Sequence, residues 1–156
     1  MDDLLRDLYQ EVILDHGKHP RNLRHPEDAN RQARGYNPLC GDQVTIYLVE
    51  DENGRIADVA FEGKGCAISM ASASMMTEVL RGKTEAEARR LFGDFHRLCT
   101  EDGFTLEQAA AEDREALERL QVLSGVRAFP VRVKCATLAW HAMTAALDGE
   151  NQVTTE

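Results

Sequence analysis

The chain has 156 residues, of which 43% are hydrophobic and 29% are charged, a balance typical of one globular domain that buries its own core. Its 27 acidic and 18 basic side chains give a net charge of -9, which disfavours binding to nucleic acid or to anionic membranes. No apolar run approaches the roughly 20 residues that span a bilayer, and the acidic start has no signal-peptide pattern, so we expect a cytoplasmic protein.

The first predicted element is an amphipathic helix over residues 2–15 that ends near Gly17. Its apolar side chains recur at helical spacing, and they are Leu4, Leu5, Leu8, Val12 and Ile13. A loop with two prolines follows, and residues 31–36 then predict a short strand that enters the turn NPLCGD.

Two more strands are predicted by an alternation of apolar and polar side chains with a period of two. They cover residues 43–49 and 55–61, and the sequence DENG between them is typical of a hairpin turn. Together with residues 31–36, these segments predict a small antiparallel sheet of three strands.

Beyond Gly65 the apolar pattern becomes helical. It predicts one helix that stops at Arg81. Thr84 and Glu87 have the spacing of a capping box, which opens another helix that runs to about Leu98.

We interpret residues 84–128 as a helical insert. Its acidic part, from Glu101 onward, has loose apolar spacing and is expected to face solvent. Pro130 fits the first turn of a last helix that runs to about Leu147.

These elements predict a single α+β domain over residues 1–150. Its helices pack on one face of the small three-stranded antiparallel sheet. Residues 151–156 are expected to form a frayed tail.

The four cysteines are not expected to form a disulfide framework, because the cytoplasm keeps thiols reduced. They are Cys40, Cys66, Cys99 and Cys135, and no CxxC pair occurs among them. This spacing argues against a zinc ribbon or a thioredoxin-type motif. Any shared site must therefore be assembled from distant segments.

Three of the cysteines fall at the ends of predicted elements. Cys40 lies in the turn before a strand, Cys66 where the sheet gives way to a helix, and Cys135 in the first turns of the last helix. Helix N-termini favour the thiolate, which is both the metal ligand and the nucleophile. With Asp42, which follows Cys40 by two residues, these thiolates would complete a tetrahedral shell for zinc.

The small residues around Cys66 fit this hypothesis. Gly63 and Gly65 let the backbone approach a site closely, and the alanines and serines that follow let the helix pack tightly. Spacing alone leaves open the alternative that the cysteines are unrelated small apolar side chains of the core.

Further evidence comes from the segments YQEVILDHGKHPRN, PLCGDQVTIYL, FEGKGCAISMASASMMTE and FPVRVKCATLAWHAM. They resemble the U-type iron–sulfur cluster assembly proteins, the family of IscU, SufU and the NifU N-terminal domain, and the SufU branch most of all. The resemblance implies an IscU-like α+β fold and a role in iron–sulfur cluster biogenesis. It also implies a metal site on Cys40, Asp42, Cys66 and Cys135.

One departure separates this chain from the IscU branch. That branch carries a histidine just before the last cysteine, where this chain has Lys134, a cation that cannot bind a metal ion. Three thiolates and a carboxylate around Zn²⁺ leave a net negative charge. Lys134 and Arg132 are the nearest cations in sequence, and either could stabilise that charge from outside the ligand shell.

By family analogy the partner is a PLP-dependent, SufS-like cysteine desulfurase, together with other cluster assembly proteins. Persulfide sulfur would pass to Cys40, whose turn can swing outward while helices hold Cys66 and Cys135. Freeing Cys40 requires a substitute metal ligand, such as a histidine of the partner. The expected function is a zinc-dependent sulfur acceptor that has no independent turnover.

Two alternatives use the same ligands. The four residues could hold a nascent [2Fe–2S] cluster, which would make the protein a scaffold that hands the cluster on. The zinc could instead be purely structural, although a carboxylate ligand and a chain long enough to have its own core argue against this.

The remaining cysteine and the histidines are interpreted structurally. Cys99 aligns with no ligand of the family and is read as a packing residue. His141 is too far along the helix from Cys135 to form a cysteine–histidine dyad. Three histidines cluster in one loop, where capping or contact with solvent is the commoner role: His16, His19 and His25.

Overall fold

The computed structural model describes residues 3–155, and side chains from residue 6 onward. The first residue of the helix predicted over 2–15, the side chains of Leu4 and Leu5, and Glu156 lie outside the described residues. Within them, one helix is followed by three consecutive strands, a run of helical segments and a short last strand, an order close to the predicted one except for that last strand.

A sheet of four strands forms one layer of the molecule. The strands are β1 (Arg31–Asn37), β2 (Asp42–Glu50), β3 (Ile56–Lys64) and β4 (Gln152–Thr154). Their order is β3-β2-β1-β4; β2 runs antiparallel to both β1 and β3, whereas β4 runs parallel to β1.

The prediction of a purely antiparallel, three-stranded sheet was therefore wrong. Residues 152–154, which were predicted to belong to a frayed tail, form β4 instead. Gly149 has a φ of 78°, in the left-handed region that favours glycine, and it turns the chain after the last helix. The backbone N–H of Arg34 then donates to the carbonyl of Asn151 at 2.9 Å, which starts the parallel pairing. Three residues are too short to show a period-two pattern.

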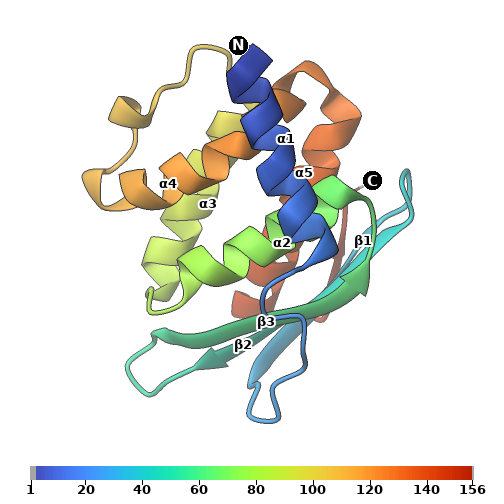
Figure 1. Cartoon of the computed structure of the whole chain (residues 1–156). Helices are drawn as coiled ribbons and strands as arrows, with labels where there is room; N and C mark the ends of the chain where they lie inside the picture. Colours follow the sequence, from blue (N-terminus) through green and yellow to red (C-terminus); the bar gives the residue numbers. More distant parts are fainter. Residues whose placement is uncertain (1–2, 156) are drawn as a thin grey trace.

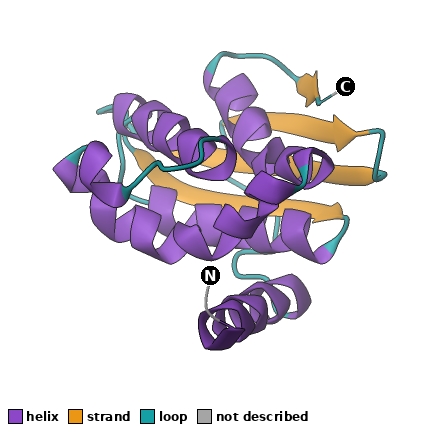
Figure 2. Ribbon diagram, turned by 90° about the horizontal axis from the view of Figure 1, so that it is seen from above, coloured by secondary structure: helices purple, strands orange, loops and turns teal. Residues whose placement is uncertain are grey.

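Helices cover one face of this sheet, as expected (Figures 1 and 2). The α-helices are α1 (Asp3–Lys18), α2 (Ala67–Leu80), α3 (Glu85–Thr100), α4 (Arg114–Leu120) and α5 (Pro130–Leu147). Short 3₁₀ segments connect α3 to α5 through α4, namely η1 (Leu106–Gln108), η2 (Ala111–Asp113) and η3 (Gln121–Ala128). The capping box of Thr84 and Glu87 and the proline in the first turn of α5 are confirmed.

The core lies between the sheet and the helices. Ile46 and Phe61, opposite each other on β2 and β3, are completely buried beneath the helical layer. On the helical side the Trp140 ring of α5 stacks on the Phe95 ring of α3, with centroids 4.8 Å apart. This packing fixes α5, and with it the position of Cys135.

The stretch from Glu101 to Leu120 was expected to face solvent, which holds for most of its residues but is wrong for several others. Phe104 and Leu117 are buried in the main core, and the carboxylate of Asp113 is 0% exposed. That carboxylate accepts hydrogen bonds from Arg90 on α3, at 2.8 Å from Nε and 3.1 Å from the terminal nitrogen. Because the segment is broken into short 3₁₀ turns, its buried residues do not follow one helical period.

The pair between Arg90 and Asp113 tests how the insert is held. Asp113→Asn removes the charge and keeps the side-chain volume, and we expect the free energy of unfolding to fall by about 2 kcal/mol. Urea unfolding followed by circular dichroism measures the change. Glu101→Gln breaks an exposed ion pair with Arg97 and serves as the control, with an expected change within about 0.5 kcal/mol. Equal losses in the two variants would contradict the anchoring role.

Candidate metal centre

The structure brings the four predicted ligands to one end of the sheet. Cys40 lies in the turn between β1 and β2, and Asp42 is the first residue of β2. Cys66 follows β3 and is the N-cap of α2, and Cys135 lies in the second turn of α5. We refer to Cys40, Asp42, Cys66 and Cys135 as the candidate metal centre.

Three of these residues lie close enough together to bind one ion after a small adjustment. The ligand atoms of Cys40, Asp42 and Cys135 all lie within 4.8 Å of one another. The sulfurs of Cys40 and Cys135 are 3.4 Å apart. Sulfurs at about 2.3 Å from a tetrahedral zinc lie about 3.8 Å apart, so a small opening of this pair accommodates the ion.

Cys66 joins the group through Asp42. One carboxylate oxygen, Oδ1, accepts a hydrogen bond from the backbone N–H of Cys66 at 2.9 Å, and the other, Oδ2, lies 3.9 Å from the Cys66 sulfur. The sulfur in turn accepts the backbone N–H of Ser69 at 3.4 Å. Cys66 is therefore held at the N-terminus of α2, where the helix dipole favours a negatively charged ligand.

Gly65 makes this arrangement possible. A Cβ at this position would lie 2.5 Å from Oδ1 of Asp42, closer than real Cβ contacts come. The space that a side chain would fill is therefore occupied by the carboxylate of a candidate ligand. This is the close backbone approach that the sequence pattern predicted for Gly65.

Burial and charge both suit a cation in this position. Asp42 and Cys135 are completely buried, whereas Cys40 is exposed. Burial, the hydrogen bond with Cys40 and the charge of Cys66 raise the pKa of the Cys135 thiol above its ordinary value. A bound cation reverses this penalty, because it stabilises the thiolate directly. The donor set of three sulfurs and one carboxylate therefore fits zinc or an iron–sulfur cluster.

Of the two cations considered for charge compensation, Arg132 shows an electrostatic link to the site. Its guanidinium has a raised pKa, first because of a hydrogen bond with Cys135 and then because of the charges of Cys66 and Cys135. Lys134 is half-buried in the first turns of α5, and among the described residues no hydrogen bond or ion pair is observed from its side chain to a candidate ligand.

Sequence reasoning missed Asn37, the last residue of β1. It is completely buried, and its side-chain nitrogen lies 3.8 Å from the Cys135 sulfur. Its backbone carbonyl accepts the N–H of Gly41 at 2.8 Å, which closes the turn that carries Cys40. The Asn–Pro pair at positions 37 and 38 is a turn signal that could have pointed to it.

The other reactive side chains lie elsewhere. Cys99 is completely buried in α3, and burial raises the pKa of its thiol to about 12. His16 is bonded through Nδ1 to Ser74 Oγ at 2.7 Å, and the His25 ring stacks on Tyr47. These contacts agree with a packing or bonding role for each of them.

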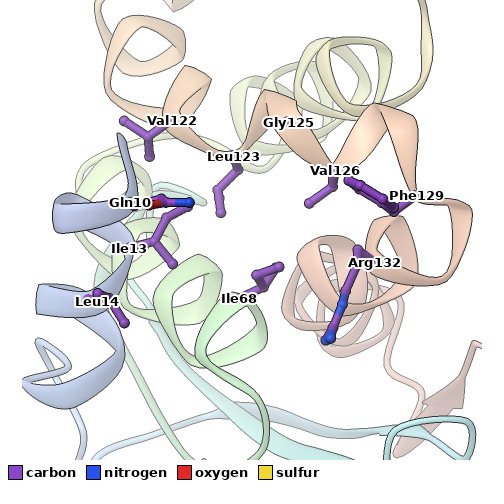
Figure 3. A pocket seen from close by; sticks show the side chains of 10 residues that line it. All are labelled: Gln10, Ile13, Leu14, Ile68, Val122, Leu123, Gly125, Val126, Phe129 and Arg132. Atoms are coloured by element: carbon purple, nitrogen blue, oxygen red, sulfur yellow. The ribbon is translucent and has the colours of Figure 1, made fainter. Parts of the chain in front are cut away.

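An apolar pocket of about 360 Å³ opens among the helices (Figure 3). Its walls come from α1, α2, η3 and the start of α5. Of its lining residues, Ile68 lies two positions after Cys66 in sequence, and Arg132 lies three positions before Cys135. Phe129, on its rim, is 61% exposed. The face that carries the site thus also carries exposed apolar surface.

Comparisons with known proteins find relatives that match most of the chain. The family model of the NifU-like N terminal domain matches residues 8–94. The zinc-dependent sulfurtransferase SufU of Bacillus subtilis is 38% identical over 142 residues, which cover 89% of this chain and 88% of that protein. The iron–sulfur cluster assembly scaffold protein IscU of Streptococcus pyogenes is 38% identical over 144 residues, which cover 92% of this chain and 84% of that protein.

Solved structures share the fold. A putative iron–sulfur cluster assembly scaffold protein for the SUF system, from Fervidobacterium islandicum, superposes with a TM-score of 0.75 at 34% identity. The match covers 91% of this chain and 98% of that one. Within residues 3–155, we find no helix whose length and apolar character would let it cross a membrane.

The contact between Gly65 and Asp42 can be tested directly. Gly65→Ala pushes the carboxylate away from Cys66, and we expect zinc affinity to fall by about 10- to 100-fold. Competition with a chromophoric chelator measures the affinity. Gly93→Ala, in the middle of α3 with open space around the added methyl group, should leave the affinity unchanged. Equal zinc affinities for the wild-type protein and Gly65→Ala would show that the close approach of Gly65 to Asp42 does not contribute to zinc binding.

Proposed function

The chain belongs to the NifU-like N-terminal domain family, and from this premise we propose that it serves iron–sulfur cluster biogenesis as a zinc-dependent acceptor of persulfide sulfur. Cys40, Asp42, Cys66 and Cys135 would hold the zinc ion, and Cys40 would receive the sulfur. The donor would be a PLP-dependent cysteine desulfurase. This assignment follows the function in the name of the SufU relative.

The proposal rests on the unequal burial of the sulfurs. Cys40 is exposed and sits on a turn, whereas Cys135 is completely buried in a helix. Cys66 is partly buried and fixed as a helix cap. A donor that approaches from solvent therefore meets Cys40 first, while the other two sulfurs stay in place.

The transfer is a thiol–disulfide exchange. The Cys40 thiolate attacks the outer sulfur of the donor persulfide, a new S–S bond forms on Cys40, and the donor cysteine leaves as a thiolate. The exchange moves one sulfur atom and needs no external electrons. Zinc, when bound, keeps the ligand sulfurs in the thiolate form and undergoes no redox change itself.

Neighbouring residues support this chemistry. Arg132 supplies a positive charge beside the sulfurs, as its raised pKa indicates. Leu39 and Phe129 are 63% and 61% exposed and flank the two segments that carry Cys40 and Cys135. Exposed apolar side chains around a reactive group are typical of a surface that docks a protein partner. Lys134 would contribute to charge balance only at longer range.

A second candidate function is that of a scaffold for a [2Fe–2S] cluster. It is favoured by the IscU relatives and by the carboxylate among the ligands, because a hard oxygen ligand makes a cluster easier to release. A purely structural zinc is less well supported. The core cluster around Trp140 and Phe61 is extensive, and none of the four candidate ligands belongs to it among the described residues.

Sulfur acceptance is tested with Cys40→Ala. Incubation with a cysteine desulfurase and ³⁵S-labelled cysteine should label the wild-type protein and leave this variant at background, because the acceptor sulfur is missing. Cys99→Ala removes a buried cysteine of α3 instead and should be labelled like the wild-type protein. Persistent labelling of Cys40→Ala would refute the assignment of the acceptor.

Anaerobic reconstitution with iron and sulfide distinguishes the two candidate functions. If the protein is a sulfur acceptor, the zinc-loaded form should retain its zinc and develop no stable visible chromophore. A chromophore that forms on the protein and moves to an apo-ferredoxin would instead favour the scaffold. Optical spectra and metal analysis before and after transfer supply the measurement.

A further inference from the structure

The three sulfurs of the candidate metal centre differ in their hydrogen-bond donors. The Cys66 sulfur accepts the backbone N–H of Ser69 at 3.4 Å. The Cys135 sulfur faces the side-chain nitrogen of Asn37 at 3.8 Å. Among the described residues, the one hydrogen-bond partner found for the Cys40 sulfur is the sulfur of Cys135, at 3.4 Å. The exposed sulfur is thus the one without an N–H donor.

The Asn37 side chain has its orientation fixed by the turn. Its Oδ1 accepts the backbone N–H of Leu39 at 3.2 Å, so its NH₂ group must point the opposite way, toward Cys135. The side chain is completely buried, and water cannot supply a competing partner. Pro38 favours the extended backbone in which the last residue of β1 is found.

An N–H donor changes the chemistry of a thiolate. It stabilises the negative charge on sulfur and lowers its tendency to attack an electrophile. Hydrogen bonds to ligand sulfurs also tune metal and cluster sites. A sulfur with such a donor is the better resident ligand, and a sulfur without one is the better nucleophile.

We infer that Asn37 is a positioning residue that keeps Cys135 as a retained ligand and leaves Cys40 as the reactive sulfur. This inference rests on the proposed function, in which one sulfur must react while the others hold the metal. One side chain has both roles. The oxygen of Asn37 shapes the turn that presents Cys40, and its nitrogen lowers the reactivity of the Cys135 sulfur.

Two substitutions test the loss of the side-chain N–H donor, and the first of them leaves the turn oxygen in place. Asn37→Asp keeps the volume and the oxygen that accepts from Leu39, but it replaces the donor with an acceptor. Asn37→Ala removes both. Asn30→Ala is the matched control. Asn30 also bonds to backbone through both side-chain atoms, each 2.8 Å from Glu50, but at the opposite end of the β1–β2 pair from Asn37.

The zinc-loaded protein is treated with limiting iodoacetamide, and peptide mass spectrometry then shows in which order its cysteines are modified. Wild-type protein and Asn30→Ala should be modified first at Cys40. In Asn37→Asp and Asn37→Ala we expect the ratio of Cys135 to Cys40 modification to rise by about tenfold. Loss of a residue that hydrogen-bonds to a metal ligand typically changes metal affinity or activity by about 10- to 100-fold, and this estimate takes the lower end of that range. An unchanged ratio in Asn37→Asp with zinc bound would overturn the inference.

A measurement on the unaltered protein keeps the test decisive if the variants fold poorly. After replacement of zinc by ¹¹³Cd, an N–H···S–Cd hydrogen bond should give a scalar coupling between the Asn37 side-chain amide proton and the metal nucleus. Absence of that coupling, with the Ser69 amide coupling present, would also overturn the inference. Neither measurement needs a desulfurase, so failure here is distinct from failure of sulfur acceptance by Cys40.

Discussion

One hydrogen bond holds the site together, the bond from the Cys66 backbone N–H to the carboxylate of Asp42. It joins the start of β2 to the start of α2, two segments that are far apart in sequence, and it forms only because residue 65 has no side chain. Through this bond the sheet and the helical layer meet at a fixed separation. The remaining ligands enter the space so defined, Cys40 from the preceding turn and Cys135 from the last helix.

The rigidity of the centre is unevenly distributed. Ser72 on α2 donates to the Ala136 carbonyl and accepts from the Trp140 indole, which ties α2 to α5 one residue beyond Cys135. Cys66 and Cys135 are thus built into packed helices. Cys40 depends on a short turn closed by Asn37 and Gly41. A site with two fixed sulfurs and one on a turn can exchange a ligand without unfolding the core.

Local sequence signals predicted most of the fold and all four candidate ligands. Period-two alternation located β2 and β3, and the capping box of Thr84 placed α3, because these patterns arise within one element. Local patterns could not reveal β4, since its pairing depends on a strand more than a hundred residues earlier. They also missed the burial of Asp113, which only its contact with Arg90 explains. The contact between Cys66 and Asp42 could be seen only in the tertiary structure, although the spacing of Gly63 and Gly65 indicated a close backbone approach near Cys66.

The short fourth strand also affects how the edges of the sheet are protected. β4 covers the free edge of β1, and on the opposite side Asn22 and Arg24 bond to both backbone groups of Phe61 on β3. Neither edge of the sheet exposes a long row of unpaired backbone groups to another chain. This lowers the tendency to aggregate through edge-strand pairing. The strand that β4 protects is the one that ends at Asn37. Residues 152–154 therefore help to hold the end of β1 in place, and with it the turn that carries Cys40.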